Sequence, residues 1–122
     1  MSSKFNMHII VKEVTYNVSF VKHIPPKCDD SDIVFGETNV YNKEILILDS
    51  LYPTDTFSTI VHELTHAFIF EYGFNDIMFD EEDLCAFMGA YIGQIFEFAN
   101  RILDNYHTTC NKNDTDKSVK GE

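Results

Sequence analysis

The sequence has few cysteines, few basic residues and no long apolar run, and each shortage excludes a class of protein. Three cysteines (Cys28, Cys85 and Cys110) without CxxC spacing indicate neither a disulfide framework nor a cysteine zinc site. Nine basic against 20 acidic residues give a net charge of −11, which disfavours nucleic acid and anionic membrane surfaces as partners. With no bilayer-spanning stretch and no apolar leader, we expect a cytoplasmic protein.

The residues that are present indicate one globular domain with an aromatic core. The chain has 122 residues, 44% of them hydrophobic, including 11 Phe and 6 Tyr. From about Asn105 the composition turns to Thr, Asn, Lys, Asp and Ser with almost no apolar side chains. We therefore expect a single domain over residues 1–104 and a polar, flexible tail over residues 105–122.

The first half of the chain reads as short strands. Residues 7–21 are rich in Ile, Val, Phe and Tyr, with a break at Lys12 and Glu13 that favours a hairpin. Two apolar runs follow, at 33–35 before Gly36 and at 45–48 before Asp49, separated by a polar stretch. We expect a small antiparallel sheet. The run at 44–49 is either the strand at the edge of a cleft, where it could pair with an extended peptide, or an interior strand.

The period of the apolar residues changes to that of a helix after Pro53. Apolar side chains recur at helical spacing from Phe57 to Tyr72, and Gly73 favours a stop. A second helix is expected to begin with Asp80 as its N-cap and three acidic residues in its first turn. The predicted fold class is α+β: a small sheet packed on a central helix, followed by a second helix.

The first helix carries the motif HExxH, as His62-Glu63-Leu64-Thr65-His66. Residues four apart share one helix face, so both imidazoles can reach a single Zn²⁺ while the glutamate acts on a water molecule. With 5 His in 122 residues, roughly 0.015 such matches are expected by chance. We predict that His62 and His66 bind zinc and that Glu63 is the general base. The alternative is a pair of hydrogen-bonded core histidines with Glu63 as a surface acid.

A catalytic zinc site needs a third protein ligand. The residues after His66 do not continue as a third-histidine motif, and the remaining histidines are not persuasively positioned: His8, His23 and His107. A carboxylate at the start of the second helix is the better candidate. We choose Glu82, because Ala86, Gly89 and Gly93 follow it as a stripe of small residues that would allow close approach to the first helix. Glu81 stays open as the alternative.

These residues resemble a known group of enzymes. The segment from His62 to Phe68, a short spacer, and the segment from Glu82 to Phe87 are similar to the small gluzincin-type metallopeptidases, the minigluzincin and ImmA/IrrE-like proteins, many of them encoded by bacteriophages. The resemblance implies a minimal zincin fold with zinc held by His62, His66 and Glu82 and with Glu63 as general base. Thermolysin-like gluzincins often carry an aspartate four residues after the ligand glutamate, where this chain has Ala86.

The predicted function is a zinc-dependent endopeptidase that hydrolyses a peptide or protein substrate with a zinc-activated water. Three side chains stay open as stabilisers of the oxyanion: Tyr72, Tyr91 and His107. An alternative is a non-catalytic or latent zincin-like binding protein with a structural metal site, in which His107 or Cys110 of the tail could block the zinc. The oligomeric state stays open.

Overall fold

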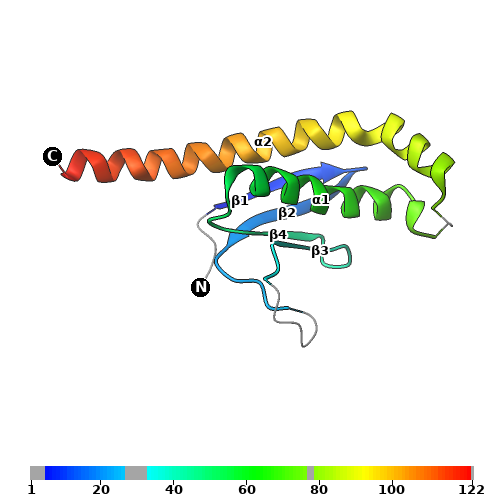
Figure 1. Ribbon diagram of the computed structural model, residues 1–122, viewed down its shortest axis with the longest axis horizontal. Coiled ribbons are helices and arrows are strands. Elements are labelled where there is room, and N and C mark those ends of the chain that lie inside the picture. The colour runs from blue at the N-terminus through cyan, green and yellow to red at the C-terminus, as the bar shows by residue number, and fades with distance from the viewer. Residues whose placement is uncertain (1–4, 27–32, 77–78, 122) are drawn as a thin grey trace.

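The computed structural model describes residues 5–26, 33–76 and 79–121; for Asp76 and residues 111–121 it describes the backbone only. The elements are strands β1 (Phe5–Val11), β2 (Val14–Val21), β3 (Gly36–Asn39) and β4 (Glu44–Leu48), helices α1 (Pro53–Glu71) and α2 (Glu81–Gly121), and the 3₁₀ helix η1 (Phe74–Asp76) (Figure 1). The predicted α+β class is confirmed. Cys85 and Cys110 are free thiols, and Cys28 lies outside the described residues.

The four strands form one mixed sheet in the order β1-β2-β4-β3. The hairpin of β1 and β2 is confirmed, and its two turn residues, Lys12 and Glu13, both have positive φ, as a tight two-residue turn requires. The prediction of an antiparallel sheet is wrong at one pairing, because β4 runs parallel to β2. After β2 the chain crosses to the outer edge to form β3, and β4 then returns through the space left between them.

The structure also decides which strand lies at the edge. β4 is interior, since it pairs with β2 on one side and β3 on the other, so the cleft-edge reading of residues 44–49 is wrong. The edge strand is β3, whose four residues are all half-buried. Residues 33–35, expected as a strand, lie before it. An apolar run does not locate this strand, because an edge strand faces solvent on one side and tolerates polar side chains.

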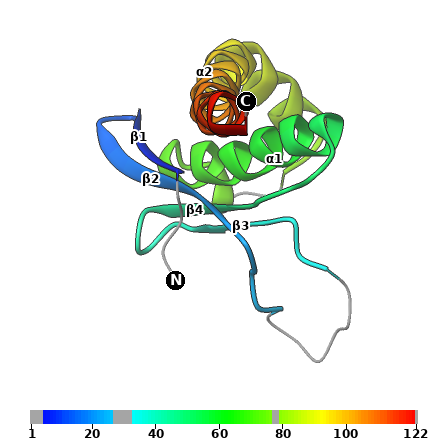
Figure 2. The ribbon, with the colours of Figure 1, turned by 90° about the vertical axis from the view of Figure 1, so that its left-hand side faces the viewer.

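Both helices lie on the same side of the sheet (Figure 2). α1 begins with proline at its first position, where the missing N–H leaves no helical bond unmade, and it is followed by Gly73 at φ 82°, as the predicted stop requires. Its buried positions include Ile60, Leu64 and Phe68, which pack into a core shared with the inward-facing residues of β1, β2 and β4. This helix is central, as expected.

The second helix begins as predicted. The Asp80 carboxylate accepts a hydrogen bond from the backbone N–H of Asp83 at 2.9 Å, and the Asp83 carboxylate accepts one from the N–H of Asp80 at 3.2 Å. The N–H of Asp83 holds the pKa of Asp80 below its usual value. The reciprocal pair satisfies two backbone donors that no helical carbonyl can reach.

The second helix does not end near Asn105. It continues to Gly121, and Tyr106, just after the expected domain limit at residue 104, packs against the sheet. The Tyr106 ring stacks on Phe20 at 3.8 Å between centroids, and its hydroxyl donates to Asp49. Burial raises the pKa of Tyr106 above its usual value, and the hydrogen bond to the Asp49 carboxylate raises it further. A solvated helix can extend beyond the core because its backbone hydrogen bonds are made within the helix. In the described part of the chain, no helix combines the length and apolar character needed to cross a membrane.

Candidate functional site

The two histidines of the motif project from the same side of α1. Their ring centroids are 4.9 Å apart and the ring planes make an angle of 75°. Both side chains are exposed, and both border a pocket of about 600 Å³. The helical spacing of His62 and His66 explains their proximity, because residues four apart lie one turn above each other.

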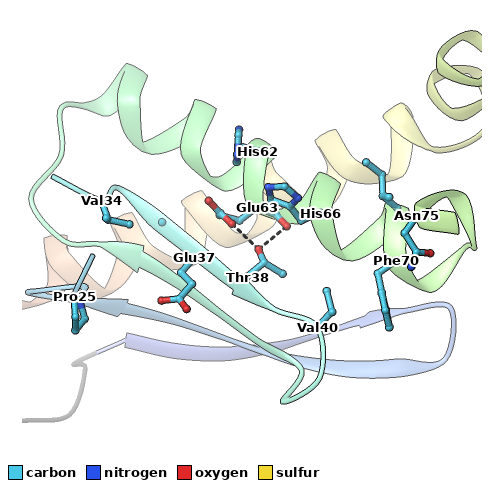
Figure 3. A pocket seen from close by; sticks show the side chains of 12 residues that line it. Pro25, Val34, Glu37, Thr38, Val40, His62, Glu63, His66, Phe70 and Asn75 are labelled. Atoms are coloured by element: carbon cyan, nitrogen blue, oxygen red, sulfur yellow. Dashed lines mark hydrogen bonds between the residues drawn. The ribbon is translucent and has the colours of Figure 1, made fainter. Parts of the chain in front are cut away.

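The pocket lies between α1 and the edge of the sheet (Figure 3). β3 and the turn after it form one wall, and α1 forms the other. Polar groups gather near the middle, where Thr38 faces the helix, while apolar side chains lie towards the ends. The lining residues outside the motif are Pro25, Val34, Gly36, Glu37, Thr38, Val40, Ile69, Phe70 and Asn75. A cavity of this size can hold several residues of a peptide or a small organic ligand.

Glu63 points towards the sheet. One residue along a helix is a rotation of about 100°, so the side chain that follows His62 faces β3. Glu63 is only 5% exposed. The Thr38 hydroxyl lies 2.6 Å from Glu63 Oε1 and 2.9 Å from the Glu63 carbonyl oxygen, both as hydrogen bonds (Figure 3). The alternative of core histidines with a surface glutamate is therefore wrong: the histidines are exposed and the glutamate is buried.

Gly36 allows β3 to approach α1 this closely. A Cβ atom at residue 36 would lie 2.8 Å from Thr59 Cγ2 and 2.9 Å from both Cγ and Oε2 of Glu63. Contacts this short require the neighbouring atoms to move. Any side chain at position 36 would therefore push the strand or the glutamate away.

The predicted third ligand, Glu82, is not brought to the histidines. Glu82 and Glu81 are exposed on the first turn of α2. Ala86, Gly89 and Gly93 are exposed too, and a Cβ at either glycine would meet no atom within 4 Å, so the expectation that this stripe packs on α1 is wrong. In the part of α2 whose side chains are described, the buried positions are Phe87, Ile95, Ala99 and Ile102. Three of these four carry large apolar side chains, which bury more apolar area against α1 and the sheet.

The other candidates also lie away from the pocket lining. Tyr72 and Tyr91 stack on each other at 4.1 Å between ring centroids, within the aromatic packing between the two helices. His107 and Cys110 lie on α2 within one turn of Tyr106, which is hydrogen-bonded to Asp49 just after β4. Neither they nor His8 and His23 border the pocket. The structure therefore gives no support to these residues as oxyanion stabilisers, ligands or blocking groups.

A partly buried ion pair fixes the far end of α1. Lys43 Nζ lies 2.6 Å from Glu71 Oε2, and the Tyr16 hydroxyl donates to the same oxygen at 2.6 Å. Burial opposes ionisation of Glu71, but the hydrogen bonds from Lys43 and Tyr16 outweigh it and lower the Glu71 pKa below its usual value. Lys43 Nζ also lies 5.0 Å from the centroid of Phe70, a pocket residue. This network links the β3–β4 turn to the pocket wall.

Thr38 and Gly36 are the site residues that sequence reasoning misses. Both belong to the polar stretch interpreted as a connection between strands. A threonine or glycine in such a stretch carries no signal of its own, because only the pairing of β3 with β4 brings it beside Glu63. Asn75 of η1, between the two helices, also borders the pocket, and a lone asparagine in a short spacer carries no signal either.

The histidine pair fits two of the three protein ligand positions of a catalytic zinc site, whose nitrogen donors are neutral imidazoles. Among the described His, Cys, Asp and Glu side chains, no group of three lies close enough to hold a metal ion. The role of Glu82 therefore stays a prediction. In comparisons with known proteins, no family model, curated protein or solved structure matches this chain.

Proposed function

We propose that this chain is a zinc-dependent endopeptidase of the small gluzincin type. The arrangement of three side chains on one turn of α1 carries the proposal. His62 and His66 are exposed to the pocket with ring centroids 4.9 Å apart, and Glu63 is buried beside them with its carboxylate held by Thr38. A buried carboxylate next to two exposed imidazoles suits hydrolysis better than structural packing, which would bury the imidazoles.

Each residue has one role in the proposed reaction. His62 and His66 would hold zinc, and Glu82 is the predicted third ligand. When bound, zinc acidifies a water molecule and polarises the scissile carbonyl. Glu63 accepts a proton from the attacking water as the water oxygen bonds to the carbonyl carbon of the substrate. It returns a proton to the leaving amine as the C–N bond breaks.

The substrate in this proposal is an extended peptide that pairs with the outer edge of β3. In the described residues, β3 has a strand partner on one side only, and its residues Gly36, Glu37 and Thr38 border the pocket. Main-chain hydrogen bonds to such an edge fix a peptide independently of its sequence. Apolar side chains of the peptide would contact Val40, Ile69 and Phe70 at one end of the pocket.

The first test is the zinc content of protein purified without added metal and without a histidine tag, measured by elemental mass spectrometry. We expect one zinc per parent chain and a large loss in His66→Ala, since a two-ligand remainder binds zinc weakly. A parent that stays without zinc after zinc addition contradicts the proposal and favours the non-catalytic binding protein.

The second test separates metal binding from catalysis. Glu63→Gln should keep zinc and lower the rate of peptide hydrolysis by roughly 100- to 10,000-fold, the contribution of a general base. A pool of fluorescence-quenched peptides of randomised sequence serves as substrate. Hydrolysis at the parental rate in Glu63→Gln would overturn the assignment of Glu63.

A further inference from the structure

Thr38 holds one oxygen of the Glu63 carboxylate. The 2.6 Å separation of Thr38 Oγ1 and Glu63 Oε1 is typical of a hydroxyl that donates to an ionised carboxylate. The same hydroxyl lies 2.9 Å from the Glu63 carbonyl oxygen, so Thr38 contacts both the backbone and the side chain of Glu63. A hydroxyl has one hydrogen to donate, and either position keeps Thr38 against Glu63 (Figure 3).

Gly36 leaves space for the other oxygen. Glu63 Oε2 lies 2.9 Å from the place where a Cβ of residue 36 would be. Gly36, His62 and Glu63 border both the pocket of about 600 Å³ and a neighbouring one of about 430 Å³. Oε2 therefore lies beside a strand position that carries no side chain, in a residue that borders both pockets.

These contacts give the two oxygens different tasks. A glutamate side chain has three rotatable bonds, and a freely rotating carboxylate presents a usable oxygen to water only part of the time. With Oε1 held by Thr38, Oε2 is left to accept a proton. Loss of orientation by about 1 Å in a catalytic group lowers rates by roughly 100-fold.

We propose that Thr38 is the positioning residue of the general base. It acts through Glu63 by fixing Oε1, and Gly36 supports it by leaving room for Oε2. This inference rests on the proposed peptidase function. It adds an element of the active site that lies outside the HExxH motif, on the edge strand β3.

The test compares two substitutions of the same residue. Thr38→Val keeps the shape of the side chain and removes the hydroxyl, whereas Thr38→Ser keeps the hydroxyl. Thr65→Val is the matched control. Thr65 lies within the HExxH motif, but its hydroxyl donates to the Val61 carbonyl oxygen at 2.7 Å and not to Glu63. The assay measures kcat and KM on a quenched peptide that the parent cleaves, together with zinc content and circular dichroism.

We expect Thr38→Val to lower kcat by roughly 10- to 100-fold with KM and zinc content unchanged. Thr38→Ser and Thr65→Val should retain the parental kcat. In a Glu63→Gln background, Thr38→Val should have no further effect, because its hydroxyl acts only through the carboxylate. A further loss of the same size in that background would show a merely structural role and overturn the inference.

Two additional measurements test the inference without relying on the kcat of Thr38→Val. Gly36→Ala places a methyl group against Oε2 and should lower kcat with Thr38 intact and zinc retained. Infrared spectra of metal-free protein should show a shifted carboxylate band between the parent and Thr38→Val, and no such shift between Glu63→Gln and Glu63→Gln/Thr38→Val.

The failures are distinguishable. Equal kcat in Thr38→Val and Thr38→Ser, in a parent that cleaves peptides, overturns the inference and leaves the proposed function standing. An unshifted carboxylate band does the same. A zinc-loaded parent that cleaves no peptide of the pool overturns the proposed function, and the role of Thr38 with it.

Discussion

Helices α1 and α2 both carry acidic side chains, but different parts of the molecule bind the acids of each helix. On α1, the Glu63 carboxylate accepts a hydrogen bond from Thr38 of β3, and Glu71 is bound by Lys43 and Tyr16. On the first turn of α2, the Asp80 and Asp83 carboxylates each accept a hydrogen bond from the other residue's backbone N–H, and Glu82 is exposed.

The difference shows that burial determines where a carboxylate side chain lies. A buried carboxylate needs donors, so the donors on the sheet determine where the side chains of α1 lie. An exposed carboxylate is satisfied by water and keeps its rotational freedom. The position of Glu63 is therefore built into the fold, whereas a role for Glu82 depends on a ligand that draws it in.

The largest expected effect tests that dependence directly. Glu82→Ala should lower zinc affinity by roughly 100-fold or more, since removing groups that merely support a ligand already costs roughly 10- to 100-fold. Competition with a fluorescent zinc chelator measures the affinity. Glu97→Ala, an exposed acid further along α2, is the control and should leave it unchanged. Zinc retained in Glu82→Ala but lost in Glu81→Ala would transfer the role to the neighbouring residue.

An intermediate effect tests the carboxylates of α1. Lys43→Met should lower the free energy of unfolding by about 1–2 kcal/mol at pH 7, because it removes a hydrogen bond to a mostly buried carboxylate. Lys22→Met, at an exposed position just after β2, should change it little. Urea unfolding of each variant gives the two values.

The effect of Lys43→Met should depend on pH. The folded protein lowers the Glu71 pKa from its ordinary value of 4.5, so this contribution to stability is present above that pH. It is lost as the pH falls through the lower pKa of the folded state, where Glu71 takes up a proton. The parent and Lys43→Met should therefore converge in stability as the pH falls below 4.5 and through the lower pKa of the folded state. An undiminished difference in acid would show that Glu71 is not the partner that matters.

The smallest expected effect concerns the exposed face of α2. Gly89→Ala should raise the free energy of unfolding by about 0.5–1 kcal/mol, because Gly89 is helical and an added Cβ meets no atom within 4 Å. Gly73→Ala is the contrasting control, since φ is 82° there and an alanine is strained. A destabilised Gly89→Ala would mean that this face of α2 packs against another part of the molecule.

The parts of the fold that were predictable depend on neighbours in the sequence. The hairpin turn at Lys12 and Glu13, the stop at Gly73 and the cap at Asp80 are local features, in which a few adjacent residues decide the backbone conformation. The pairing of His62 with His66 is local too, because helical spacing alone brings them together.

The parts that failed depend on contacts between distant segments. The parallel pairing of β4 with β2 joins residues 27 apart, and the hydrogen bond of Thr38 to Glu63 joins residues 25 apart. The stripe of Ala86, Gly89 and Gly93 was assigned to the contact with α1 by size alone. The larger side chains on the opposite face gain more by burial, and they decide how the helix is turned.

By itself, the sequence determined the α+β class, the two helices and a motif whose histidines share one face. Only the tertiary structure decided that β3 is the edge strand, that Glu63 is buried against Thr38, and that the first turn of α2 lies apart from the histidines. The physical reason is that helical periodicity acts within a few residues, whereas sheet order and the burial of one carboxylate are settled when the whole core packs.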